Sequence, residues 1–210
     1  MAVSINQLFS EFNLNYSKAI KWNEKFEAKF NGVYIIAQTS DPFTIIAKNP
    51  KFGICPDAFS SWTKEATELK INGKESDGIN EFTNHLNEFW NPNENILYIG
   101  QSSSKTNPIQ KRVGQFYSHK LGQKGPHTGG YWMKLLDCLK DTYIFYSETQ
   151  NPRDTEFKLL MKFIEYSSGK SFYDLENIGN YLPFANLTAD FYKVHGIKNP
   201  TNKNRRKNAR

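Results

Sequence analysis

Three stretches of the chain are apolar enough, and rich enough in β-branched and aromatic residues, to predict core strands. They cover residues 32–37, 95–100 and 142–146. Turn-forming residues bound the first two, since Asn31 precedes one and Pro92 lies just before the other. A shorter apolar run at 44–47 is a candidate for a further strand.

Helical spacing of apolar residues appears between these strands. Residues 109–121 carry one apolar face, behind Pro108. Residues 151–168 have the clearest pattern, because Pro152 suits the first helical position, Asp154 complements the helix dipole and Gly169 suits the end. Residues 60–90 are expected to be mostly helical, with breaks near 72–73 and 77–78.

These elements predict an α/β or α+β domain with a small central sheet of about three strands and helices around it. The length of 210 residues suits one substantial domain. We expect an N-terminal helical arm at 1–29, the domain proper at 30–197 and a basic, disordered tail at 198–210.

The positive charge is concentrated in that tail. The chain has a net charge of +6, yet residues 198–210 hold six basic residues and no acid, and residues 1–197 hold 21 of each sign. A basic tail suits nucleic acid, because each neutralised phosphate releases counterions. A solvated end with no partner is the alternative.

The sequence also indicates in which cellular compartment the protein is expected. No apolar run reaches the roughly 20 residues that span a bilayer, and the N-terminus lacks the pattern of a signal peptide. Cys55 and Cys138 are too few for a disulfide framework. We therefore expect a cytoplasmic protein of prokaryotic type, in a reducing compartment and without a membrane partner.

None of the common local motifs considered for this sequence indicates a function. The run from Gly100 to Thr106 follows a strand, but it lacks the second glycine of a phosphate-binding loop. No Gly-x-Gly-x-x-Gly fingerprint is present. The four histidines and two cysteines lack the spacing of a structural zinc site.

One set of residues, in a fixed order along the chain, remains as a candidate functional motif. Two predicted strands carry a tyrosine near a glycine, in Gly32-Val33-Tyr34 and Tyr98-Ile99-Gly100. Arg112 follows on a predicted helix, 12 residues after Gly100; Glu156 lies near the start of a later helix, and Asn186 closes the set. Together these features resemble the GIY-YIG nuclease family, over roughly residues 30–190.

The chain also departs from the family pattern. Sixty-three residues separate Tyr34 from Tyr98, so we expect a large insertion at 38–93 between the first two motif strands. Gln101 stands where the family often has lysine, and Lys105 is the candidate substitute. The family histidine one turn after the arginine is replaced by Phe116, which leaves His119 and His127 as candidates.

The resemblance implies hydrolysis of phosphodiester bonds. Tyr34 would take a proton from water with help from Arg112, whose planar fork also suits phosphate oxygens. Glu156 would hold one divalent ion, Mg²⁺ or Mn²⁺, and Tyr98 would bond the water or the phosphate. Asn186 would orient its neighbours. The remaining candidates are His119 in catalysis and Lys105, Lys111 and His127 in DNA binding.

We therefore expect a metal-dependent endonuclease acting on double-stranded DNA, site-specific in the manner of a restriction enzyme. A homodimer would suit cleavage of both strands. The alternatives are a structure-specific repair nuclease, a non-catalytic nucleic-acid-binding protein on a nuclease scaffold, and an accidental match in an unrelated α/β protein. If the match were accidental, Tyr34, Tyr98, Arg112 and Glu156 would not converge on one concave surface.

Overall fold

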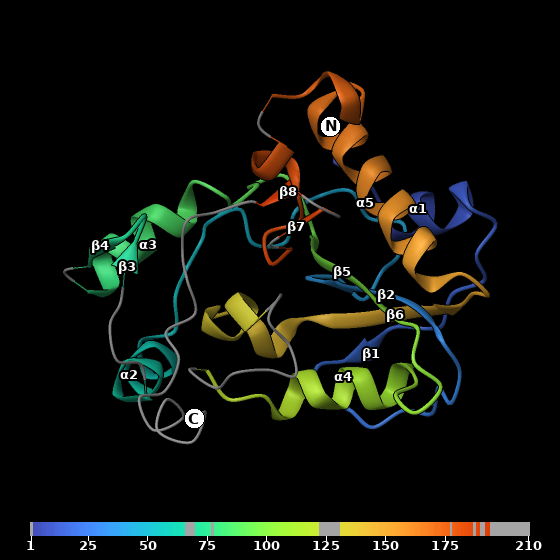
Figure 1. The fold of residues 1–210 in the computed structure, drawn as a ribbon, viewed down its shortest axis with the longest axis horizontal. Coiled ribbons are helices and arrows are strands. Elements are labelled where there is room, and N and C mark those ends of the chain that lie inside the picture. The colour runs from blue at the N-terminus through green and yellow to red at the C-terminus, as the bar shows by residue number, and fades with distance from the viewer. Residues whose placement is uncertain are drawn as a thin grey trace, which may run out of the picture.

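A computed structural model of the chain describes residues 2–65, 70–76, 78–121, 131–176, 178–186, 188–189 and 192–193. Its α+β fold has helices on both sides of a central antiparallel sheet (Figure 1). No helix among the described residues has the length and apolar character needed to cross a membrane.

The central sheet has four strands in the order β1-β6-β2-β5. They are β1 (Ile20–Lys21), β6 (Tyr143–Glu148), β2 (Gly32–Ala37) and β5 (Ile96–Ser102). The three predicted strands are confirmed as β2, β5 and β6. The fourth strand comes from the N-terminal segment, where Ile20 pairs with Ile144 in the antiparallel register. Residues 44–47 form no strand, so that prediction was wrong; Ile45 and Ile46 are exposed instead.

Both faces of the sheet are covered, which explains why every residue of β2 is buried. Successive side chains of a strand point to opposite faces. Val33, Ile35 and Ala37 pack against the helices α1 (Ile5–Glu11) and α5 (Pro152–Ser168). Tyr34 and Ile36 belong to the other core, which includes the buried face of α4 (Ile109–Ser118). The predicted helices at 109–121 and 151–168 are thus confirmed.

The ends of α5 follow the sequence signals. Asn151 is the N-cap residue and Pro152 opens the helix, although the Asn151 side chain makes no capping hydrogen bond. Gly169 ends it in the left-handed conformation, with a φ of 71° that a residue lacking Cβ adopts without strain.

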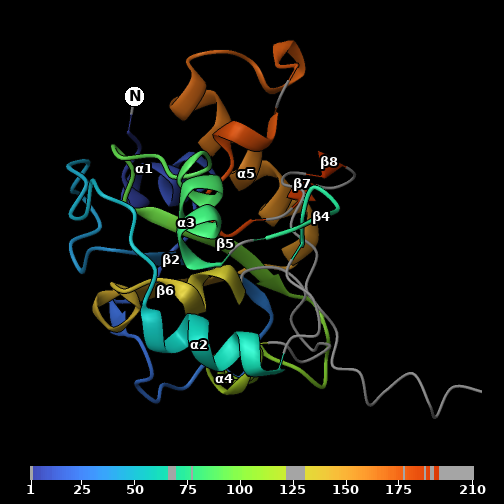
Figure 2. The same ribbon diagram turned by 90° about the vertical axis from the view of Figure 1, so that its left-hand side faces the viewer.

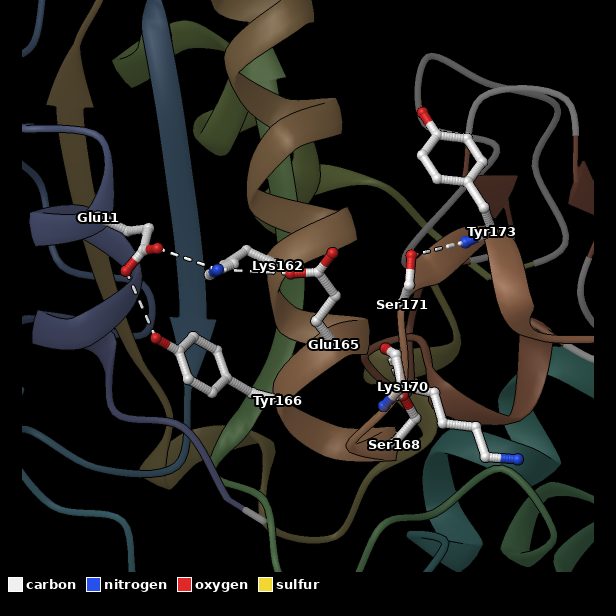
Figure 3. Close-up of polar contacts among 8 residues, drawn as sticks. All are labelled: Glu11, Lys162, Glu165, Tyr166, Ser168, Lys170, Ser171 and Tyr173. Carbon is white, nitrogen blue, oxygen red and sulfur yellow. Dashed lines mark hydrogen bonds and ion pairs between the residues drawn. The ribbon is translucent and has the colours of Figure 1, made fainter.

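Polar contacts join α1 to α5 on the outer side of this core (Figure 3). Lys162 lies 3.0 Å from a carboxylate oxygen of Glu11 and 3.4 Å from one of Glu165, and the hydroxyl of Tyr166 donates to Glu11 at 3.4 Å. These contacts and the apolar face of α1 attach the N-terminal segment to the body. The segment is helical only over Ile5–Glu11, and it contributes a strand as well.

The predicted insertion forms a lobe at one end of the sheet, which faces the viewer in Figure 2. It contains α2 (Pro56–Glu65), a hairpin of β3 (Lys70–Ile71) and β4 (Lys74–Glu75), and α3 (Ile79–Asn87). Asn72 and Gly73 both have positive φ, as a tight hairpin turn requires. The mostly helical prediction for 60–90 therefore missed the hairpin.

Aromatic packing holds the lobe to the body. The ring of Trp62 lies 5.0 Å from that of Phe82 and 5.7 Å from that of Trp132, both edge-on. Trp132 belongs to a short 3₁₀ helix, Tyr131–Leu135, and a second one, Leu139–Asp141, leads into β6. After α5 the chain forms 3₁₀ turns at Phe172–Asp174 and Ile178–Tyr181 and a hairpin of β7 (Thr188–Ala189) and β8 (Tyr192–Lys193).

Candidate functional site

The two tyrosines of the constellation lie side by side despite their separation in the sequence. β2 and β5 are antiparallel neighbours, and Tyr34 is opposite Gly100 in their register. The ring centroids of Tyr34 and Tyr98 are 5.8 Å apart. The insertion lobe thus leaves the end of β2 and returns the chain to the adjacent strand.

Gly100 is required by this packing. A Cβ at this position would lie 2.5 Å from Cε1 of Tyr98, 2.8 Å from Cζ of Tyr34 and 2.9 Å from its hydroxyl oxygen. The Tyr34 ring therefore occupies the space where any larger residue would place its side chain. Gly32 is constrained similarly, because a Cβ there would collide with the backbone carbonyl of Ser147 on β6.

Arg112 and Glu156 join the tyrosines from two separate helices. Arg112 is on α4 and Glu156 on the second turn of α5. Both act electrostatically on Tyr34 and on Tyr98, and Arg112 also acts on Glu156. Four side chains from four different elements therefore share one electrostatic environment. Tyr34 is fully buried, however, so the four side chains do not all lie on one concave surface.

Burial dominates the protonation of the tyrosines. Tyr34 is fully buried, and this burial raises its pKa well above the ordinary value, with a further increase from the neighbouring Tyr98. Burial likewise raises the pKa of Tyr98 to about 12, and Glu156 adds to this effect. Arg112 lowers both pKa values, as expected from the sequence, but its influence is the smaller one. Both tyrosines therefore keep their phenolic protons at pH 7.

Glu156 is a carboxyl poised between its two protonation states. Burial raises its pKa to about 7, against lowering by Arg112 and Arg153. Sequence reasoning missed Arg153, although it precedes Glu156 by three residues, a spacing that places two side chains on the same face of a helix. A cation beside this carboxylate would compensate the buried negative charge.

Asn186 is buried beside β5 and bonds its backbone. Its side-chain oxygen accepts from the N–H of Ile99 at 2.9 Å, and its side-chain nitrogen donates to the carbonyl of the same residue at 2.8 Å. The backbone N–H of Ala185 also donates to the carbonyl of Leu97, at 2.9 Å. The asparagine thus holds the strand that carries Tyr98 and Gly100.

The other described candidates, His119, Lys105 and Lys111, are on α4, at its end or on the loop before it. His119 is buried at the C-terminal end of α4, and it is not among the groups that shift the pKa of Tyr34 or Tyr98. Lys105 is exposed on the loop between β5 and α4. Lys111 is also exposed, and its ammonium donates to the carbonyl of Thr106 in that loop at 3.0 Å. His127 and the basic tail lie outside the described residues.

A partly buried lysine near the end of α4 also escaped the sequence analysis. The ammonium of Lys134 donates to the carbonyls of Tyr117, at 2.7 Å, and His119. Burial lowers its pKa to about 8. Lysine near the last carbonyls of a helix is favourable, but here it comes from a distant segment, which no local sequence signal reveals.

Comparisons with protein-family models, with curated proteins and with solved structures give no significant match for this chain.

Proposed function

We propose that this protein is a metal-dependent endonuclease that hydrolyses DNA phosphodiester bonds and resembles the GIY-YIG nucleases. The observation that carries the proposal is the shared electrostatic environment of Tyr34, Tyr98, Arg112 and Glu156, which come from β2, β5, α4 and α5. Phosphodiester hydrolysis needs an activated water, a positive group for the phosphate and an anionic group for a metal. This set contains a candidate for each.

Glu156 fits a single divalent ion. Mg²⁺ keeps most of its waters and takes one or two protein carboxylates together with substrate phosphate. The partly buried carboxyl of Glu156, with a pKa raised to about 7, is a group whose charge a divalent ion would stabilise. No cluster of three or more potential ligands occurs among the described residues, so Glu156 would act with water and phosphate oxygens. When bound, Mg²⁺ or Mn²⁺ would supply positive charge at the leaving oxygen.

The chain's own residues have separate tasks in this proposal. Arg112 binds the phosphate and lowers the pKa of both tyrosines. Tyr98, 8% exposed, donates a hydrogen bond to phosphate or water. Tyr34, fully buried over Gly100, would take a proton from water only as the tyrosinate, so its own phenolic proton must first leave the site, a loss that the positive charge of Arg112 favours. Asn186 is a positioning residue, because it acts through Ile99.

Double-stranded DNA is the proposed substrate, and site-specific cleavage the proposed mode. The six basic residues of 198–210 suit a polyanion, and the insertion lobe offers surface for recognition beside a small domain. Cleavage of branched or damaged DNA, as in repair, is the nearest enzymatic alternative.

A cleavage assay on plasmid and phage DNA tests the proposal. We expect cutting in Mg²⁺, none in EDTA, and loss of cutting in Glu156→Gln. Glu165→Gln is the matched control, since Glu165 is on the same helix but pairs with Lys162 away from the tyrosines. Discrete bands would support site-specific cleavage, and cutting confined to branched substrates would support a repair nuclease.

One observation favours the non-catalytic alternative. The hydroxyl of Tyr34 does not contact solvent, because the residue is fully buried. It also has no hydrogen bond of normal geometry among the described residues. A nucleic-acid-binding protein on a nuclease scaffold could retain such a closed site. DNA that is shifted on a gel but never cut by the wild type would establish this alternative and refute the nuclease.

A further inference from the structure

A polar groove of about 1000 Å³ lies between the N-terminal segment and the end of the central sheet. Six side chains give it its character: Asn13, Asn15, Lys29, Asn31, Lys105 and Gln150. They come from four regions, namely the segment after α1, the residues just before β2, the loop after β5 and the loop after β6. Its volume is at the upper end of the range for pockets that hold drug-sized ligands.

The lining is rich in hydrogen-bond donors. Four residues with side-chain amides and two lysines line the groove, and within the described part of the chain none of these six side chains makes a hydrogen bond or ion pair. Glu148 contributes one acid. Amide and ammonium donors of this kind are the groups that proteins use to contact phosphate and sugar oxygens.

Loops that lead into the two helices of the site line the groove. The loop holding Lys105 joins β5 to α4, on which Arg112 lies, and residues 147–150 lead directly into α5, on which Glu156 lies. These chain segments gather at the right-hand end of the sheet in Figure 1, opposite the insertion lobe. A polynucleotide strand leaving the site past the first turns of α4 and α5 would therefore meet the groove.

We propose that this groove holds the sugar-phosphate backbone of a DNA strand that flanks the cleaved bond; the inference rests on the proposed function. A site for a stacked base fits less well. Tyr146 in the wall is already stacked on Phe26, with centroids 5.1 Å apart, and its hydroxyl donates to the carbonyl of Glu27.

A second pocket allows the charges that line the groove to be compared with those of another site. It has a volume of about 610 Å³ and lies between residues 23–27 and α4. Its charged side chains are of both signs, since Glu24 and Glu27 accompany Lys25 and Lys111. A polyanion gains little there. The larger groove combines two lysines and four amides with one acid, so the balance favours phosphate.

The test measures the salt dependence of DNA binding by the full chain in EDTA, with a 30-base-pair duplex. Each lysine that neutralises a phosphate contributes about 0.9 to the slope of log K against log salt. The double variant Lys29→Gln/Lys105→Gln should lose about 2 from that slope and bind at least tenfold more weakly. Asn13→Ala/Gln150→Ala should bind more weakly with an unchanged slope, because amides carry no charge.

The matched control is Lys140→Gln/Lys170→Gln. Both lysines are exposed, but Lys140 precedes β6 and Lys170 follows α5, so each is at the far end of an element that borders the groove. A loss of slope equal to that of the Lys29/Lys105 variant would overturn the inference. Equal melting temperatures of wild type and variants would show that folding is not the cause.

The two proposals can fail separately. Mg²⁺-dependent cleavage with an unchanged slope in Lys29→Gln/Lys105→Gln would refute the groove and keep the nuclease. DNA binding with the expected loss of slope, but no cleavage in Mg²⁺ or Mn²⁺, would refute the nuclease and keep the groove as a backbone contact. Absence of both binding and cleavage would overturn both.

Discussion

The side-chain amide of Asn186 pairs with both backbone polar groups of Ile99, in the manner of a neighbouring strand. β5 is an edge strand, so its outer N–H and C=O groups have no partner in the sheet. Both atoms of the amide are buried with them, since Asn186 is 5% exposed. The asparagine thus supplies hydrogen-bond partners for the outward N–H and C=O groups of Ile99, which lies between the two motif residues Tyr98 and Gly100.

Removing this amide should destabilise the protein. In Asn186→Ala the N–H and C=O of Ile99 would stay buried without partners, at a cost of about 2–4 kcal/mol. Asn186→Asp keeps an acceptor for the N–H but faces the carbonyl with a carboxylate, so we expect a loss of similar size that grows with pH. Urea unfolding measures both, and the exposed Asn93→Ala is the control. Unchanged stability in Asn186→Ala would contradict the pairing.

Two glycines should respond oppositely to the same substitution. Gly100→Ala places a methyl group 2.5 Å from the Tyr98 ring and should cost about 1–3 kcal/mol through overpacking. Gly114→Ala on α4 meets nothing within 4 Å and should gain up to about 1 kcal/mol from helix propensity. Thermal melting of the two variants checks this. A stabilising Gly100→Ala would show that Tyr34 does not occupy that space.

Stability should fall as the pH rises from about 4.5 to 7, because of Glu94. Burial raises its pKa from 4.5 to about 7, despite a hydrogen bond from the N–H of Val3. Between these values the folded protein binds more protons than the unfolded chain, so deprotonation costs stability, by about 3 kcal/mol in total. Urea unfolding at pH 5 and pH 8 measures the difference.

Glu94→Gln should make the pH profile shallower and raise the stability at pH 8. It should not remove the slope fully, because the pKa of Glu156 is raised to about 7 as well and contributes with the same sign. Glu75→Gln, on the exposed hairpin, should leave the profile as in the wild type. An identical profile in Glu94→Gln would show that this carboxyl titrates normally.

Arg112 should be needed for its shape as well as its charge. Arg112→Lys keeps the positive charge but loses the planar fork, so we expect cleavage to slow about 100-fold or more while DNA affinity changes only a few-fold. Arg153→Lys should have a smaller effect, because Arg153 acts on Glu156 and is not among the groups that shift either tyrosine. Single-turnover rates at saturating protein measure both. Equal losses would contradict the central place of Arg112.

The sequence predicted the elements whose signals are local. β2, β5 and α5 were found because each combines a hydrophobic pattern with clear turn or cap residues, such as Pro152 and Gly169.

The sequence missed the elements that depend on distant partners. β1 has two residues, too few for a pattern, and exists because Ile20 pairs with Ile144. Ile45 and Ile46 are apolar but exposed, since Asn95 bonds the backbone of Ile46 and Lys48 and holds the segment as a loop. The raised pKa values of Tyr34 and Tyr98 follow from burial in the assembled core, which composition does not reveal.

The sheet also fixes when this protein can finish folding during synthesis. β1 must wait for β6, more than a hundred residues later, which at about 5–20 residues per second means roughly 6–25 s of translation. The free edge of β5 waits longer, until Asn186 has been made. A nascent chain that has passed Glu156 but not reached Asn186 therefore contains the two tyrosines, the arginine and the glutamate without the asparagine that holds the edge of β5, and the site can be completed only after Asn186 has been made.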